Sequence, residues 1–128
     1  MLFSGINVVS IPVPDLAVAK SFYGEVLGLG EPLYDLPEAG WIEFRTGGPG
    51  NLSVTTAPEG WRPSESTTVV LNVAECRQAW RSLRERGVRC DDPVDFPGFV
   101  TFCSFYDPFG NRLQMCSPLP GEQEHTPT

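Results

Sequence analysis

Few groups of side chains in this sequence have the types and spacing that catalyse reactions or bind metals. The one histidine, His125, lies in the C-terminal tail, which leaves no imidazole elsewhere to act as a general base. Glu43 and Tyr106 are weak candidates for acid–base catalysis. The alternative for Glu43 is a carboxylate that is exposed or paired with Arg45 or Arg112. The Gly-x-Ser-x-Gly and phosphate-loop motifs are absent.

The cysteines do not form a metal-binding pattern. Cys76, Cys90, Cys103 and Cys116 lie far from one another and from the histidine, and no two have Cys-x-x-Cys spacing. Cys103 and Cys116 fall on neighbouring predicted strands and could approach each other, but two thiols lack the further ligands that zinc requires. We therefore expect four reduced, buried thiols and no zinc site.

Length and charge restrict the function classes. The chain has 128 residues, of which 41% are hydrophobic, so it can form one domain or two half-size modules. The net charge of −7 argues against nucleic acid or an anionic membrane as a partner. No apolar run reaches about 18 residues and no signal peptide is evident. We therefore expect a cytoplasmic protein without membrane segments.

The clearest turn of the sequence is Asp107-Pro108-Phe109-Gly110, which has turn-forming chemistry at each position. Strand-like residues flank it, so the segment 100–116 is predicted to form a hairpin. On its outgoing strand Leu113 and Met115 share one face. Gln114 is predicted on the other face, opposite the expected core.

A second set of elements repeats the first after about 60 residues. In the first half, hydrophobic periodicity predicts a helix over 15–27 and strands over 6–13, 31–36, 41–46 and 52–57. In the second, it predicts a helix over 75–86 and strands over 67–73, 88–94, 100–106 and 112–116, with a loop over 93–98. The predicted organisation is a first module (1–57), a linker (58–66), a second module (67–118) and a disordered tail (119–128).

These elements predict an α+β fold of two β-α-β-β-β modules, with a curved mixed sheet, a concave cleft and helices outside. The helices account for one apolar face of each set of strands. The other face mixes polar and aromatic side chains, which suits a ligand-binding cleft. The candidate ligand-binding residues are Val8, Ser10, Trp41, Glu43, Ser53, Thr55, Trp61, Thr68, Asn72, Phe102 and Gln114. Phe96, Phe99 and Tyr106 are further aromatic candidates, for which ordinary packing is the alternative.

Several motifs resemble those of one known superfamily. They are Ile11-Pro12-Val13-Pro14-Asp15-Leu16, Phe22-Tyr23, Leu27-Gly28-Leu29 and Asp107-Pro108-Phe109-Gly110-Asn111. Together with the paired modules they are similar to the vicinal oxygen chelate superfamily. This group includes glyoxalase I, extradiol dioxygenases, fosfomycin-resistance enzymes and bleomycin-resistance proteins. The resemblance covers residues 5–118.

The resemblance implies where a divalent metal would be held. The ligand positions of the superfamily fall on Val8, Thr68, Gln114 and about Ser53. None of these is a histidine or a carboxylate, and a divalent transition metal needs such ligands to offset its dehydration. We therefore expect no metal cofactor.

Two function classes remain open. The favoured one is a metal-free, homodimeric binding protein of the bleomycin-resistance type, connected with antibiotic resistance and holding a flat or cationic ligand. The alternative is a glyoxalase-like lyase, an isomerase or a dioxygenase-type enzyme. That enzyme would use Glu43 or Tyr106, or metal ligands that the sequence does not reveal.

Overall fold

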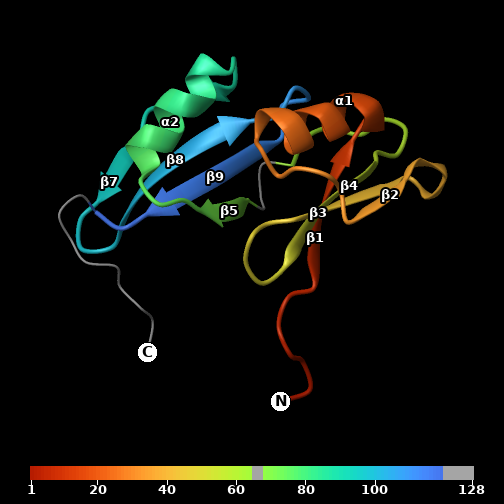
Figure 1. Cartoon of the computed structure of the whole chain (residues 1–128), viewed down its shortest axis with the longest axis horizontal. Coiled ribbons are helices and arrows are strands. Elements are labelled where there is room, and N and C mark those ends of the chain that lie inside the picture. Colours follow the sequence, from red (N-terminus) through yellow and green to blue (C-terminus); the bar gives the residue numbers. More distant parts are fainter. Residues whose placement is uncertain (65–67, 120–128) are drawn as a thin grey trace. The chain divides into compact units, whose positions relative to one another are not determined.

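The structure is a computed structural model that describes residues 1–64 and 68–119. The chain divides into two compact units, the first spanning Met1–Pro63 and the second starting at Ser64 (Figure 1). The expectations for His125 and for residues 120–128 of the tail lie outside the described residues, as do those for residues 65–67.

The first unit contains a four-stranded mixed sheet with strand order β1-β4-β3-β2. β1 and β4 are parallel, while β4–β3 and β3–β2 are antiparallel. Its elements are β1 (Val8–Val13), α1 (Leu16–Ser21), the π-helix η1 (Phe22–Val26), β2 (Tyr34–Leu36), the 3-10 turn η2 (Pro37–Ala39), β3 (Trp41–Arg45) and β4 (Asn51–Thr56).

The second unit contains a five-stranded sheet in which β5, β9, β8 and β6 follow in that order and β7 also pairs with β8. β5 and β9 are parallel, and the other pairs are antiparallel. Its elements are β5 (Val69–Asn72), α2 (Cys76–Glu85), β6 (Arg89–Cys90), β7 (Val94–Phe96), β8 (Val100–Tyr106) and β9 (Arg112–Ser117).

The segment between α2 and β8 differs from the prediction. A single strand over 88–94 and a loop over 93–98 were expected, but two short strands, β6 and β7, occupy this segment. A tight turn, in which the Phe99 amide donates to the Phe96 carbonyl at 3.0 Å, folds β7 back onto β8. Pro93 has no N–H to donate to a ladder and lies in the break between the two strands.

The first helix also differs from its predicted form. A single helix over 15–27 was expected, but its second half is the π-helix η1, in which the Leu27 amide donates to the Phe22 carbonyl at 2.9 Å. The wider turn lets the neighbouring rings of Phe22 and Tyr23 both be buried, edge to face, with 5.2 Å between their centroids. These rings pack in the core.

Each unit buries one face of its sheet under its helix, which confirms the α+β class and the mixed sheets. In the first unit α1 packs on β3 and β4, over Ile42, Phe44, Leu52 and Val54. In the second unit α2 lies along β8 and β9 (Figure 1), over Cys103, Phe105, Leu113 and Met115. Strand pairing among the described residues stays within each unit, so the chain has two sheets. The joining of these sheets around a cleft stays a prediction.

Local chemistry explains where the helices begin. The Asp15 carboxylate accepts from the Val18 amide at 3.0 Å, as its position before the helix predicted. Glu75 caps α2 in the same way, accepting from the amides of Arg77 and Gln78 at 3.1 and 2.8 Å. No helix in the described residues is long and apolar enough to cross a membrane.

Gly24, in the π-helix, is required because the backbone approaches it closely. A Cβ atom at Gly24 would lie 3.0 Å from the Gly30 carbonyl oxygen and 3.3 Å from the Phe44 ring. We therefore expect Gly24→Ala to lower the free energy of unfolding by about 1–3 kcal/mol through overpacking, measured by urea denaturation. Gly48→Ala is the matched control, since no heavy atom lies within 4 Å of a Cβ there. Equal stability of the two variants would contradict this packing argument.

Candidate functional site

One face of the first sheet carries most of the predicted ligand-binding residues of that unit. Residues directly opposite each other on paired strands point to the same side. The register places Ser10 beside Ser53, Ser53 beside Glu43, and Glu43 beside Tyr34 in one row. The adjacent row is Pro12, Thr55, Trp41 and Leu36, and Val8 lies in the row on the other side, beside Asn51 and Arg45. We call this surface polar face 1.

Glu43 is the central charged group of polar face 1 and is only 6% exposed. Its Oε1 accepts from the Trp41 indole Nε1 at 3.0 Å, and its Oε2 accepts from the Asn51 side-chain amide at 2.7 Å. The expected partners Arg45 and Arg112 form no ion pair with it among the described residues. Asn51 was not among the residues predicted to bind a ligand, although it alternates with the buried Leu52 and therefore belongs to the polar face.

Ser10 and Ser53 complete the row on the other side of Glu43. Their hydroxyl oxygens are 2.7 Å apart, and Ser53 is fully buried whereas Ser10 is exposed. Trp61 is not on the sheet: it follows β4 in a turn where its amide donates to the Pro58 carbonyl at 3.1 Å. Polar face 1 therefore brings together Val8, Ser10, Trp41, Glu43, Ser53 and Thr55, but not Trp61.

The corresponding face of the second sheet, polar face 2, has neutral chemistry at its centre. Gln114 lies between Val70 and Ser104 in the register, and its Nε2 donates to the Ser104 hydroxyl at 3.1 Å. The next row contains Asn72, Cys116 and Phe102, and the Cys116 thiol lies 3.7 Å from the Asn72 side-chain oxygen. Ser53 pairs with Ser10 on the first strand of its unit, and Gln114 pairs with Val70 on the first strand of the other unit. This shared pairing makes Ser53 the counterpart of Gln114.

Two arginines flank Tyr106 at the other end of polar face 2. Tyr106 lies between Arg89 and Arg112, and the Arg89 guanidinium is 4.0 Å from the centroid of its ring. The Arg112 guanidinium donates to the Thr68 hydroxyl at 2.6 Å. The Tyr106 hydroxyl donates to Asp91 at 2.7 Å, and this hydrogen bond raises the pKa of the phenol. A raised pKa makes Tyr106 a poor acid near neutral pH.

Polar face 2 also has an exposed apolar edge. Phe96 and Phe99 are 53% and 67% exposed, and their ring centroids are 5.2 Å apart. Val70 and Val94 are exposed on the same unit. Exposed aromatic rings of this kind offer stacking surface to a flat ligand or to another protein chain.

The metal positions that the resemblance implies do not fit a divalent transition metal. They carry Val8, Ser53, Thr68 and Gln114, which supply no imidazole, thiolate or carboxylate. Within residues 1–64 and 68–119, no group of three or more His, Cys, Asp or Glu side chains is placed to hold a metal ion. Glu43 is the one carboxylate on polar face 1.

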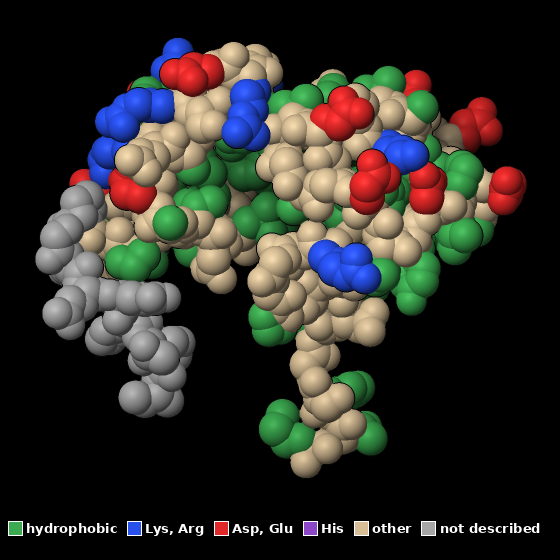
Figure 2. Space-filling view, in the orientation of Figure 1, with side chains coloured by type: hydrophobic (Ala, Val, Ile, Leu, Met, Phe, Trp, Pro, Cys, Tyr) green, Lys and Arg blue, Asp and Glu red, His purple; other side chains and the backbone are tan. Residues whose placement is uncertain are grey.

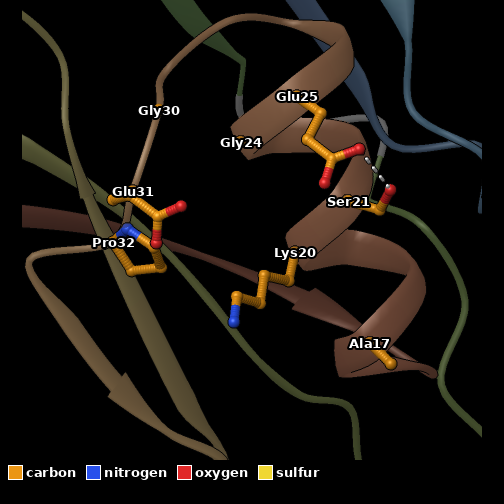
Figure 3. Close-up of a pocket in the computed structure, with 8 residues that line it drawn as sticks. All are labelled: Ala17, Lys20, Ser21, Gly24, Glu25, Gly30, Glu31 and Pro32. Atoms are coloured by element: carbon orange, nitrogen blue, oxygen red, sulfur yellow. Dashed lines mark hydrogen bonds between the residues drawn. The ribbon is translucent and has the colours of Figure 1, made fainter.

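A separate hollow of about 440 Å³ lies on the helical side of the first unit (Figure 3). Its charged groups are Lys20, Glu25 and Glu31. Lys20 forms an ion pair with Asp35 at 2.7 Å, and this hydrogen bond raises the pKa of the lysine. Ser21 donates to Glu25 at 3.4 Å. None of the predicted site residues lines this hollow, which is open to solvent.

Basic and acidic side chains are distributed unevenly along the chain. Figure 2 shows arginine side chains gathered over α2, which carries Arg77, Arg81 and Arg84. Arg77 pairs with Asp95 at 2.9 Å and Arg84 lies over the Trp80 ring at 4.8 Å. Residues 1–63 instead contain seven Asp or Glu and three Lys or Arg residues. The first unit therefore carries a net charge of −4, against −3 for the rest of the chain.

The fold and the two polar faces define a protein of two related α+β units, each with one sheet face free of its helix. A family model described as the Glyoxalase/Bleomycin resistance protein/Dioxygenase superfamily matches residues 5–115, and the chain belongs to this superfamily. The resemblance inferred from the sequence is thereby confirmed. A comparison with curated proteins found no match.

Several solved structures share the fold of this chain. The antibiotic binding protein TnmS3 from Streptomyces sp. CB03234 has 29% identity and a TM-score of 0.77, covering 92% of this chain and 98% of that one. A glyoxalase/bleomycin resistance protein from the same source has 28% identity and a TM-score of 0.70, covering 87% and 98%. A glyoxalase family protein from Bacillus anthracis, at 21% identity, TM-score 0.77 and coverage of 92% and 98%, shares the fold.

The four cysteines lie in two kinds of environment. Cys76 and Cys103 are fully buried, and burial raises the pKa of their thiols to about 11 and about 12. Cys90 and Cys116 are half-buried. Cys103 pairs in register with Met115 and not with Cys116, so the two thiols point to opposite faces of the sheet and do not converge.

Because the thiolate is the reactive form, we expect the buried thiols to resist modification. In the folded protein at about pH 8, a thiol reagent such as Ellman's should modify Cys90 and Cys116, whereas Cys76 and Cys103 should react only after unfolding. Absorbance gives the number of reacting thiols, and peptide mass spectrometry identifies them. Rapid reaction of Cys76 or Cys103 in the folded protein would contradict this assignment.

Proposed function

We propose that this protein is a metal-free small-molecule-binding protein of the glyoxalase/bleomycin-resistance type, which holds an organic ligand against the polar faces of its sheets. The observation that carries the proposal is the chemistry of these faces. They present hydrogen-bonding and aromatic side chains, while the residues at the implied metal positions lack suitable donors.

The side chains of the two faces support recognition of a flat organic molecule. Trp41, Phe102, Phe96 and Phe99 offer ring surface for stacking. Gln114, with a donor and an acceptor, would orient a polar group of the ligand. We further propose that Trp61 contacts the ligand from the turn after β4, since ligand contacts concentrate in such connecting segments.

The likeness to TnmS3 supports the class of ligand. That protein is described as antibiotic binding, and it is 29% identical over nearly the whole of both chains. We propose that the present protein likewise sequesters an antibiotic-like organic compound, contributing to resistance in the cytoplasm. Its net charge of −7 supports neither nucleic acid nor a membrane as partner.

The organisation of the chain is part of the proposal. We assign residues 1–57 and 67–118 to the two modules and residues 58–66 to the linker. We also propose a homodimer, because the exposed apolar edge of polar face 2, with Val70, Val94, Phe96 and Phe99, offers surface that a second copy can cover.

A ligand screen combined with a metal assay tests the proposal. The purified protein is dialysed after incubation with zinc, nickel and manganese, and its metal content is measured by elemental analysis. We expect less than stoichiometric metal, together with quenching of tryptophan fluorescence by members of an antibiotic panel. Stoichiometric retained metal would instead favour the alternative, a glyoxalase-like lyase, isomerase or dioxygenase-type enzyme.

Gln114 provides a test of the binding face. With a compound from that screen, Gln114→Ala should weaken binding by about 1 kcal/mol, or about fivefold, through loss of one neutral hydrogen bond. Isothermal titration calorimetry measures the change. Gln78→Ala on the exposed side of α2 is the control and should bind as the parent does. Unchanged affinity of Gln114→Ala would remove this residue from the site.

A further inference from the structure

Glu43 is a buried carboxylate that has hydrogen-bond donors but, among residues 1–64 and 68–119, no basic partner. It is 6% exposed, and both of its oxygens accept from neutral groups, the Trp41 indole and the Asn51 amide. The salt bridges of the described residues are Lys20–Asp35 and Arg77–Asp95. Arg45 lies two positions along the same strand, on the same face, yet it forms no ion pair with Glu43.

This arrangement leaves the negative charge only partly compensated. Removing a carboxylate from water is costly unless hydrogen bonds and an opposite charge replace its hydration. A carboxylate can accept about four hydrogen bonds. The N–H groups of Trp41 and Asn51, at 3.0 and 2.7 Å, supply one hydrogen bond to each oxygen of Glu43. Each oxygen can therefore accept a further hydrogen bond from a cation.

Two aromatic residues flank Glu43 on polar face 1. Tyr34 lies directly opposite it in the β2–β3 register and is 51% exposed, so its ring is available to a ligand beside the carboxylate. Trp41 lies two residues before Glu43, with the edge of its indole bonded to the carboxylate. Aromatic faces attract cations, and their rings stack on planar groups. On the opposite side, the hydroxyls of Ser10 and Ser53 are bonded to each other.

We propose that Glu43, Trp41 and Tyr34 form a binding site for the cationic head of a planar organic ligand, such as an amidinium or guanidinium group. The planar N–H groups of such a head would bond to both carboxylate oxygens. The acidic character of the first unit, visible as red side chains in Figure 2, favours approach of a cation. This inference rests on the proposed function, because it names the chemistry of the small molecule bound there.

Benzamidine and benzamide are a matched pair of probes that differ in charge but share a planar aromatic shape. We expect the parent protein to bind benzamidine at least about tenfold more tightly, the order of a hydrogen bond to a charged group. Glu43→Gln should abolish this preference. Glu38→Gln changes the net charge equally at an exposed position and should retain it. Isothermal titration calorimetry measures all the affinities, and circular dichroism checks that each variant is folded.

A second measurement uses the parent protein, so the cation site can be tested even if Glu43→Gln does not fold. In ¹⁵N–¹H spectra, benzamidine should shift the indole N–H signal of Trp41, which is bonded to Glu43, more than those of Trp61 and Trp80. Trp41→Phe assigns the signal. Equal shifts of all three signals, or absence of binding by benzamidine, would overturn the inference.

The two proposals fail in different ways. Should neutral organic compounds bind while benzamidine has no advantage over benzamide, the cation site is wrong and the proposed function stands. Should no organic compound bind in the fluorescence screen or in calorimetry, the proposed function and the cation site are both wrong.

Discussion

The parallel pairing of the first and last strand of each unit is the constraint on which the rest of the structure depends. β1 pairs with β4 and β5 pairs with β9, both in parallel. Parallel neighbours cannot be joined by a tight turn, so the chain must cross over between them. In each unit the crossover contains a helix, which covers one face of the sheet. The side chains buried there include Phe44 and Leu52 in the first unit, and Leu113 and Met115 in the second. Since side chains alternate along each strand, the same pairing leaves the other face to the polar residues.

The two units use the same register for different chemistry. The position occupied by Ser53 in the first unit holds Gln114 in the second, and the neighbouring strands contribute Ser10 and Val70. Polar face 1 is centred on the buried charge of Glu43, whereas the centre of polar face 2 is neutral and its edge is aromatic. The scaffold of the superfamily therefore fixes where these side chains lie, and the residue types at a few positions determine what they can bind.

The departures from the predicted elements have local physical causes. The helix was predicted from apolar spacing, which does not distinguish an α-helix from the π-helical turn in which Phe22 and Tyr23 are buried. Val94 was predicted to end a strand over 88–94, and residues 93–98 were predicted to form a loop, but Val94–Phe96 form the separate strand β7. The pairing of Val94 with Phe102 depends on a turn formed by residues that follow it.

The sequence by itself determined the α+β class, the helix starts at Asp15 and Glu75, and the alternation of faces along strands such as β1, β3, β4 and β9, because these depend on short-range periodicity and capping. The superfamily could also be recognised from its motifs. Only the tertiary structure decided which residues meet on those faces. Asn51 and Tyr34 contact or face Glu43 through strand register. That register is set by packing between segments distant along the chain, which the alternation of a single strand leaves open.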